Sequence, residues 1–351
     1  MGFVPVASCD DIYCVDMRAP VILLQDVLLR LKQPHQSDDD VKRAVLATRP
    51  KLRGVLNSMF AGNLLLCFDS EMLNQSVMER VQKINGVENV PQGVRQLGPY
   101  MCVPYGKILS NEVVPNTVTK TLRAEKKFAS DVDSFDVVEY PGYSPLKNQV
   151  RTLRSFRRPV ILVDDLLHKG YRIEKLDRVL REEGLTTGRI VVAMMSGYGQ
   201  DLMRVQGREA ECEYFIPNLR YWFTESLLYP FIGGDSIGDK GTTEHLIPSI
   251  NLVLPYYFPH FIGDVTDEDI RRFSCVALEN ALELMQTLEK RHQEVFNTTL
   301  TIRRLGEALQ QPRLPDKGVC MKYDMNLPAS AYLQEDLRQI QRICRGEKEQ
   351  E

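Results

Sequence analysis

Short, nearly continuous apolar runs are the clearest pattern in this chain. Three of them occur at residues 63–69 (NLLLCFD), 160–165 (VILVDD) and 189–195 (RIVVAMM). An apolar run of four to eight residues, bounded by polar or turn residues, is typical of a strand buried on both faces. These runs therefore predict strands of a parallel sheet that helices cover on both sides.

Between and after these runs, apolar residues recur three and four positions apart, which predicts amphipathic helices. Thr266, followed by acidic residues in the first turn, predicts the start of the longest helix. The expected helices span residues 39–47, 70–84, 170–183, 266–297, 301–311 and 329–345.

The alternation of strand, helix and strand predicts an α/β fold with a mainly parallel sheet. We expect three regions: an N-terminal α/β extension (1–57), an α/β core (58–235) and a C-terminal, mainly helical region (236–351). The last boundary follows Gly233-Gly234-Asp235, after which the sequence becomes rich in proline and aromatic residues.

Composition narrows the class of protein. The chain has 351 residues, of which 43% are hydrophobic and 26% charged, and this excludes a disordered chain, a collagen and a coiled-coil rod. The formal net charge of −3 makes nucleic acid an unlikely main partner. The eight scattered cysteines include no CxxC pair, and no signal peptide or long apolar run is evident. We therefore expect a cytoplasmic protein without a membrane partner.

The segment PVILVDDLLHKGYR (159–172) carries the most specific chemistry. A buried strand delivers Asp164 and Asp165 toward its carboxyl end, where ligands bind in open α/β sheets. A loop with Gly170 and the start of a helix follow, and their backbone N–H groups suit a phosphate. Adjacent carboxylates suit ribose hydroxyls, or a Mg²⁺ that a diphosphate carries.

This segment resembles the PRPP-binding loop of type I phosphoribosyltransferases, which has an apolar strand, two acidic residues, three variable residues, Thr or Ser, Gly, one residue, and Thr or Ser. The resemblance implies a phosphoribosyltransferase-like core and Mg²⁺ held with the diphosphate ligand. It also implies that Asp164 and Asp165 hold ribose hydroxyls and act as the catalytic pair. The 5-phosphate would then be bound by the loop residues His168, Lys169, Gly170, Tyr171 and Arg172.

Two residues depart from the family pattern. Lys169 and Arg172 stand where the family has hydroxyl residues. Both can bind phosphate through charge, and both are compatible with a different ligand or with loss of catalysis. The alternative interpretation of the acidic pair is that it closes the edge of a sheet and forms salt bridges with nearby basic residues.

Other stretches offer supporting candidates. The stretch MCVPYGKIL (101–109) predicts a strand that runs into a Gly-Lys turn, and Lys107 of this turn is a candidate for pyrophosphate binding. Lys120 and Arg123 are further candidates, although a solvated basic segment explains these two equally well. Basic residues at 147–158 share one helical face, and the simpler interpretation is that they form ion pairs with nearby acidic residues. Trp222 and its aromatic neighbours suit a core, an interface or a pocket wall.

A second resemblance covers PNTVTK and residues 143–170. These stretches look like an uncharacterised bacterial family of the same fold, sometimes labelled cytidylyltransferase-related. The chain lacks the HxGH motif of cytidylyltransferases, so that activity is not carried over.

Two functions remain open at this level. In the first, the chain is an enzyme that binds PRPP or a nucleotide and transfers or releases the phosphoribosyl group. In the second, the same site senses a nucleotide or phosphosugar without catalysis, and the C-terminal helices contact a partner. A homodimer is typical of the resembled family. RNA binding through the basic face is a third possibility, which the net charge disfavours.

Overall fold

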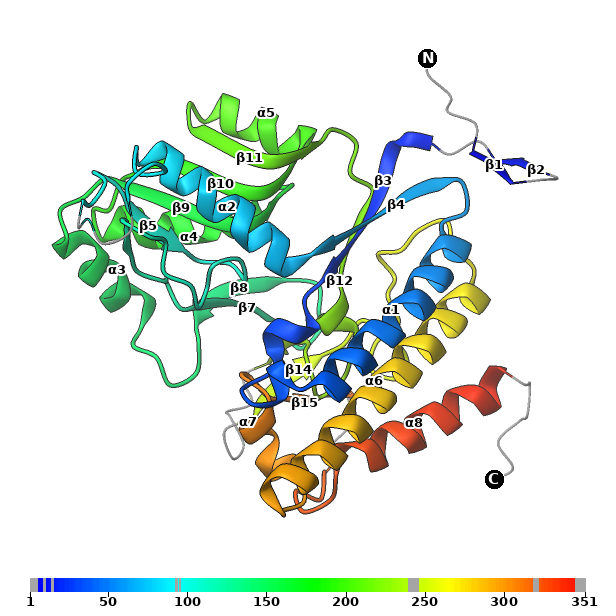
Figure 1. Cartoon of the computed structure of the whole chain (residues 1–351). Coiled ribbons are helices and arrows are strands. Elements are labelled where there is room, and N and C mark those ends of the chain that lie inside the picture. The colour runs from blue at the N-terminus through cyan, green and yellow to red at the C-terminus, as the bar shows by residue number, and fades with distance from the viewer. Residues whose placement is uncertain are drawn as a thin grey trace.

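The computed structural model describes residues 6–8, 11–13, 16–91, 94, 96–238, 246–317 and 322–344. It confirms the predicted fold class: parallel sheets covered by helices, followed by a helical C-terminal region (Figure 1). Strands on either side of residue 57 pair with each other, as β3 does with β4, and strands on either side of residue 235 do so as well, as β7 does with β13. The division into three regions stays a prediction.

The central sheet has five strands, all parallel, in the order β11-β10-β9-β5-β6. Its strands are β5 (Met101–Pro104), β6 (Val118–Thr119), β9 (Val160–Leu167), β10 (Thr187–Ser196) and β11 (Glu209–Ile216). Side chains alternate between its two faces, so both faces bury apolar residues. Helix α2 (Ser70–Ile84) covers one face, whereas α3 (Leu146–Ser155) and α4 (Tyr171–Glu182) cover the other. Helix α5 (Gly197–Val205) packs beside β10 and β11.

Two further sheets flank this core. The second is parallel, in the order β12-β3-β4, with β3 (Asp16–Gln25), β4 (Asn63–Asp69) and β12 (Tyr221–Thr224). Along β3, Ile22 and Leu24 face the core on the α2 side, and Val21 and Leu23 face the helical region. The third sheet is mixed, in the order β15-β14-β13-β7-β8, with β7 (Ala124–Phe128), β8 (Phe135–Glu139), β13 (Asp235–Ile237), β14 (Ile247–Ile250) and β15 (Arg313–Pro315). A small antiparallel pair, β1 (Val6–Ser8) and β2 (Asp11–Tyr13), precedes them.

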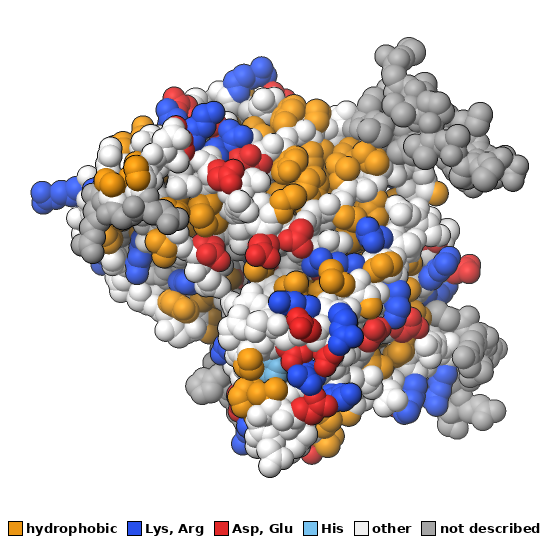
Figure 2. Space-filling model, viewed as in Figure 1, with side chains coloured by type: hydrophobic (Ala, Val, Ile, Leu, Met, Phe, Trp, Pro, Cys, Tyr) orange, Lys and Arg blue, Asp and Glu red, His pale blue; other side chains and the backbone are white. Residues whose placement is uncertain are grey.

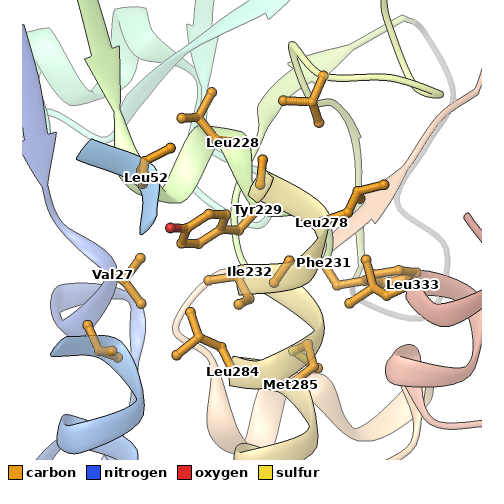
Figure 3. Close-up of a cluster of buried hydrophobic side chains, with 14 of the residues drawn as sticks. Val27, Leu52, Leu228, Tyr229, Phe231, Ile232, Leu278, Leu284, Met285 and Leu333 are labelled. Carbon is orange, nitrogen blue, oxygen red and sulfur yellow. The ribbon is translucent and has the colours of Figure 1, made fainter. Parts of the chain in front are cut away.

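Three long helices form a layer on the far side of the second sheet. Figure 1 shows α6 lying between α1 and α8, and the same pairs are in contact. Their bounds are α1 (Asp39–Met59), α6 (Asp267–Phe296) and α8 (Ala329–Cys344). Figure 3 shows the apolar cluster that joins them, in which Tyr229 and Phe231 meet side chains of α1, α6 and α8. Figure 2 shows basic and acidic side chains interspersed over α1 and α6. Lys51 of α1 and Glu283 of α6 form an ion pair there.

Two predicted helices differ from the structure. The helix that Asp38 caps was expected to end near Ala47, but α1 continues through Pro50 to Met59. Burial of Leu52, Val55 and Leu56 in the helical layer favours this continuation. The helix expected at 301–311 is shorter, consisting of η4 (Ile302–Arg304) and α7 (Leu305–Ala308). There, Leu309 forms a bridge with Leu31 instead, so pairing with a distant segment ends the helix.

Candidate functional site

The central sheet has a topological switch point between β5 and β9. From β9 the chain moves outward through β10 to β11, whereas from β5 it moves to β6 in the opposite direction. Pairing between β5 and β9 ends at Pro104 and Val163, and the Tyr105 N–H donates a last hydrogen bond to the Val163 carbonyl over 3.0 Å. Open α/β sheets bind their ligands at such a point, outside the carboxyl ends of the strands.

The acidic pair lies at this point. Asp164 and Asp165 follow Val163 within β9 and are only 2% and 8% exposed. Arg172, from the first turn of α4, places its Nη1 atom 2.8 Å from Asp164 Oδ1 and 3.1 Å from Asp165 Oδ1. Its Nη2 atom donates to the Tyr105 carbonyl over 3.1 Å, and its guanidinium lies over the Tyr105 ring. One arginine thus bridges both carboxylates and the end of the neighbouring strand.

The electrostatics of this pair are asymmetric. Burial raises the pKa of Asp164 well above its ordinary value, and Asp165 raises it further, against the effect of Arg172. For Asp165, burial acts in the same direction, but Arg172 and other groups outweigh it, so its pKa is lowered. Because one guanidinium faces two carboxyls, Asp165 holds the negative charge and Asp164 is the group that takes up a proton.

A cavity of about 290 Å³ opens over the pair. All five residues of the predicted phosphate-binding loop line this cavity, which we call the first cavity. Gly170 adopts a left-handed backbone conformation (φ 76°) immediately before α4, as a tight strand-to-helix connection requires. His168 is held in place by Ser196, whose Oγ lies 2.7 Å from His168 Nδ1. Lys169 and Tyr171 are exposed at the rim.

The three pyrophosphate candidates are placed differently. Lys107 lines the first cavity, together with the acidic pair. Lys120 and Arg123 line a separate depression, and Arg123 also borders a second cavity next to Lys107. The reason is that the segment after β6 continues to pair along β5, since Lys120 N–H donates to the Cys102 carbonyl. That segment therefore lies on the side of β5 away from β9.

Several residues of the first cavity could not be identified from the sequence. Glu125 of β7 and Arg313 of β15 form a buried ion pair of 3.2 Å in its wall. Arg30 and Tyr105 also line it. Trp222, one of the residues considered for a pocket wall, lines it too, with its Nε1–H bonded to Thr224. These side chains come from the second and third sheets, from the residue after β5 and from the 3-10 helix at Val27–Arg30, and no local motif connects them.

The basic helical face serves a local structural role. Arg151 pairs with Glu183 at 2.7 Å and Lys147 with Glu182 at 2.9 Å, which ties α3 to the end of α4. Arg154 donates to the Glu183 carbonyl. None of these basic residues lines the first cavity. These contacts agree with the interpretation that the basic face at 147–158 pairs with nearby acidic residues.

The absence of a side chain at Gly106 lets the chain after β5 lie close to the acidic pair. A Cβ atom at this position would overlap Asp164 Oδ1 and lie 3.2 Å from Asp165 Oδ1. We expect Gly106→Ala to push Asp164 away from Arg172 and to lower the free energy of unfolding by about 2 kcal/mol. Chemical denaturation measures this loss. Gly188→Ala, where a Cβ has no neighbour within 4 Å, is the control. Equal stability of the two variants would show that the close packing at Gly106 is unimportant.

Two features are absent from the described residues. No group of three or more His, Cys, Asp or Glu side chains among them is placed to hold a metal ion. Within that same part of the chain, no helix has the length and apolar character needed to cross a bilayer.

Comparison with known proteins adds little to this geometry. No protein-family model matches the chain, and no curated protein sequence matches it. Among solved structures, a purine phosphoribosyltransferase from Pyrococcus horikoshii aligns with 44% of this chain and 86% of its own, at 10% identity and a TM-score of 0.24. The case for a function of this chain therefore rests on the geometry of its own cavity.

Proposed function

We propose that the first cavity binds a phosphoribosyl compound, such as PRPP or a nucleotide, and that the chain transfers or releases its phosphoribosyl group. The observation that carries this proposal is the position of a buried acidic pair at the switch point, beside a glycine loop and the start of α4. Carboxylates accept hydrogen bonds from vicinal hydroxyls, and a helix start with adjacent cations suits a phosphate.

The charge of the cavity supports an anionic ligand. Six basic side chains line it against four carboxylates, whereas the whole chain has a net charge of −3. Glu125 and Arg313 neutralise each other. Lys107, Lys126 and Lys169 remain close to the acidic pair and its loop. A ligand with a phosphate or diphosphate at one end and hydroxyls at the other matches this distribution.

In this proposal the ribose hydroxyls contact Asp164 and Asp165, and the 5-phosphate contacts the loop at 168–172. Lys107 faces the leaving pyrophosphate, and Mg²⁺ enters with the diphosphate as part of the substrate. Negative charge at the pair then stabilises the cationic, oxocarbenium-like transition state of transfer. Asp165 supplies this charge, since Arg172 lowers its pKa against the effect of burial.

One observation favours a second function, ligand sensing without catalysis. Arg172 already donates to Oδ1 of Asp164 and to Oδ1 of Asp165, the two carboxyls that the proposal assigns to the ribose. A ligand therefore has to share these carboxylates with Arg172 or displace it. Release of pyrophosphate from bound PRPP distinguishes the functions, because a sensor binds PRPP and returns it intact.

PRPP binding tests the site itself. Trp222 is the only tryptophan and lines the first cavity, so its fluorescence reports occupancy, and calorimetry supplies the affinity. We expect Mg²⁺-dependent binding that the double variant Asp164→Asn/Asp165→Asn weakens about 100-fold, because the charge-assisted hydrogen bond to Asp165 and the contact with the Asp164 carboxyl are lost. The control is Asp39→Asn/Asp40→Asn, an adjacent pair at the start of α1 outside the cavity. Equal affinity of native chain and double variant would refute the proposal.

A further inference from the structure

A third cavity, of about 500 Å³, lies at the carboxyl end of the second sheet. Strands β3 and β4 end there, at Gln25 and Asp69, and both residues line it. Most of its other walls come from α1, the start of α2 and the segment between β3 and α1. The strands of this sheet are parallel, so their carboxyl ends form the kind of edge at which open α/β sheets bind ligands. The cavity shares no lining residue with the first cavity, so a ligand can occupy it independently.

Arg49 of α1 lines this cavity, which we call the Arg49 cavity. The residue is only 8% exposed, and its Nη1 atom donates to Asp69 Oδ2 over 3.3 Å. Its Nε atom has no hydrogen-bond partner in the described part of the chain, because the Oε2 atom of Glu225, at 3.6 Å, is beyond hydrogen-bond distance. A buried donor without a partner is costly, and in a cavity wall it points to an acceptor that a ligand supplies.

The positive charge of Arg49 is only partly compensated by the protein. Burial raises the pKa of Glu225 to about 8, so this carboxyl is neutral at pH 7. The charge of Asp69 is shared, since its Oδ1 atom accepts from the Glu71 N–H at the start of α2. A ligand carboxylate would supply both the missing acceptor and the missing charge, and its planar shape matches a guanidinium.

Cations and carboxylates lie on different walls of the Arg49 cavity. Lys42 and Arg49 lie about two turns apart on one face of α1. Glu71 lies in the first turn of α2, and Glu112 lies in the segment after β5. Lys42, Glu71 and Glu112 form no ion pair within the described residues. A ligand with a single charge would therefore meet repulsion from one wall, whereas a ligand with a charge of each sign is attracted by both.

We propose that the Arg49 cavity binds a free α-amino acid. Its carboxylate contacts Arg49 and Lys42, and its ammonium group contacts the carboxylates at the start of α2. This inference does not rest on the proposed function. The neutral groups of the walls favour an amino acid with a polar side chain, because carboxamides both donate and accept hydrogen bonds. Five carboxamides line the cavity: Gln25, Gln33, Gln36, Asn74 and Gln75.

Lys42 is the residue best suited to a test, because its removal leaves no charged partner behind among the described residues. Calorimetry with the common L-amino acids, one at a time, measures binding to the full chain. We expect an amino acid with a polar side chain to bind, and Lys42→Met to weaken it about tenfold, since one charge-assisted hydrogen bond is lost. Lys51→Met, on the same helix but outside the cavity, is the matched control and should bind within about twofold of the native chain.

Analogues of the bound amino acid assign its two charges to the walls. The corresponding amine lacks the carboxylate, and the corresponding acid lacks the ammonium group. Each analogue should bind at least about tenfold more weakly than the amino acid itself. Lys42→Met should not weaken binding of the amine further, because the amine has no carboxylate for Lys42 to contact.

Several outcomes would overturn the inference. They are binding of no amino acid, an amine or acid analogue that binds as tightly as the amino acid, an equal effect of Lys42→Met and Lys51→Met, and tighter binding of inorganic phosphate or putrescine than of any amino acid. PRPP should bind the native chain and Lys42→Met equally, because the first cavity is separate. Failure of PRPP to bind the native chain would thus refute the proposed function and leave this inference standing.

Discussion

Arg172→Met should lower the free energy of unfolding by about 3 kcal/mol at pH 7, because it leaves two buried carboxyls without their counter-charge. Arg172 Nη1 contacts both Asp164 and Asp165, and its Nη2 holds the Tyr105 carbonyl at the end of β5. Its removal therefore affects the junction of two strands as well as the charge balance. Urea denaturation, followed by circular dichroism, measures the loss.

The pH dependence of the stability loss distinguishes the effect of the missing charge from the effect of lost packing. Without Arg172, the pKa values of the two carboxyls rise, since burial and mutual repulsion act unopposed. A group whose pKa is raised on folding contributes stability at low pH and loses it as the pH increases. The deficit of Arg172→Met should consequently shrink on acidification toward pH 4, and adding Asp164→Asn should restore part of the stability at pH 7.

Arg178→Met provides the reference, because Arg178 is exposed on the same helix. We expect it to change stability by no more than about 0.5 kcal/mol. A deficit of Arg172→Met that is constant between pH 4 and pH 8 would mean that lost packing on Tyr105, and not the charge of the pair, explains the effect.

The segment around the acidic pair could be predicted from sequence because its determinants are local. The apolar run, the carboxyls, Gly170 and the amphipathic helix are consecutive, and each acts on its immediate neighbours. Gly170 indeed adopts the left-handed conformation that the strand-to-helix connection needs. The predicted start of α6 at Thr266 is confirmed for the same reason, since its capping box involves only Thr266 and Asp269.

The rest of the site depends on contacts between residues far apart in the chain. Arg30, Glu125 and Arg313 reach the first cavity from different parts of the sequence. The salt bridges expected in the alternative interpretation of the acidic pair are formed by Arg172, although the sequence alone does not single out this residue among its basic neighbours. The pairing of the segment after β6 along β5 separates Lys120 from the pair, and no local pattern encodes that register.

Glu225→Gln should remove a large pH dependence of stability. Glu225 directly follows β12 and is fully buried, with its Oε2 atom 3.6 Å from Nε of Arg49. Burial raises the pKa of Glu225 to about 8, with a further contribution from Asp26 and against the effect of Arg49. The folded chain therefore keeps a proton on this carboxyl at neutral pH, whereas the unfolded chain has lost it.

Because of this difference in protonation, the native chain should lose stability as the pH rises. The ordinary pKa of a glutamate is 4.5, so the stability contributed by the protonated group is complete below pH 4.5 and is lost as the pH rises toward 8. A shift of this size corresponds to a loss of about 5 kcal/mol across that range. Glutamine, which cannot ionise, retains the neutral form at every pH.

We therefore expect native chain and Glu225→Gln to be equally stable near pH 4. At about pH 9, the free energy of unfolding of the variant should exceed that of the native chain by about 5 kcal/mol, in denaturation series over that range. Glu279→Gln, at an exposed position on α6, should follow the native curve throughout. Parallel curves for native chain and Glu225→Gln would mean that Glu225 is ionised in the fold. Arg49, which also contacts Asp69 at 3.3 Å, would then compensate its charge at the carboxyl end of the second sheet.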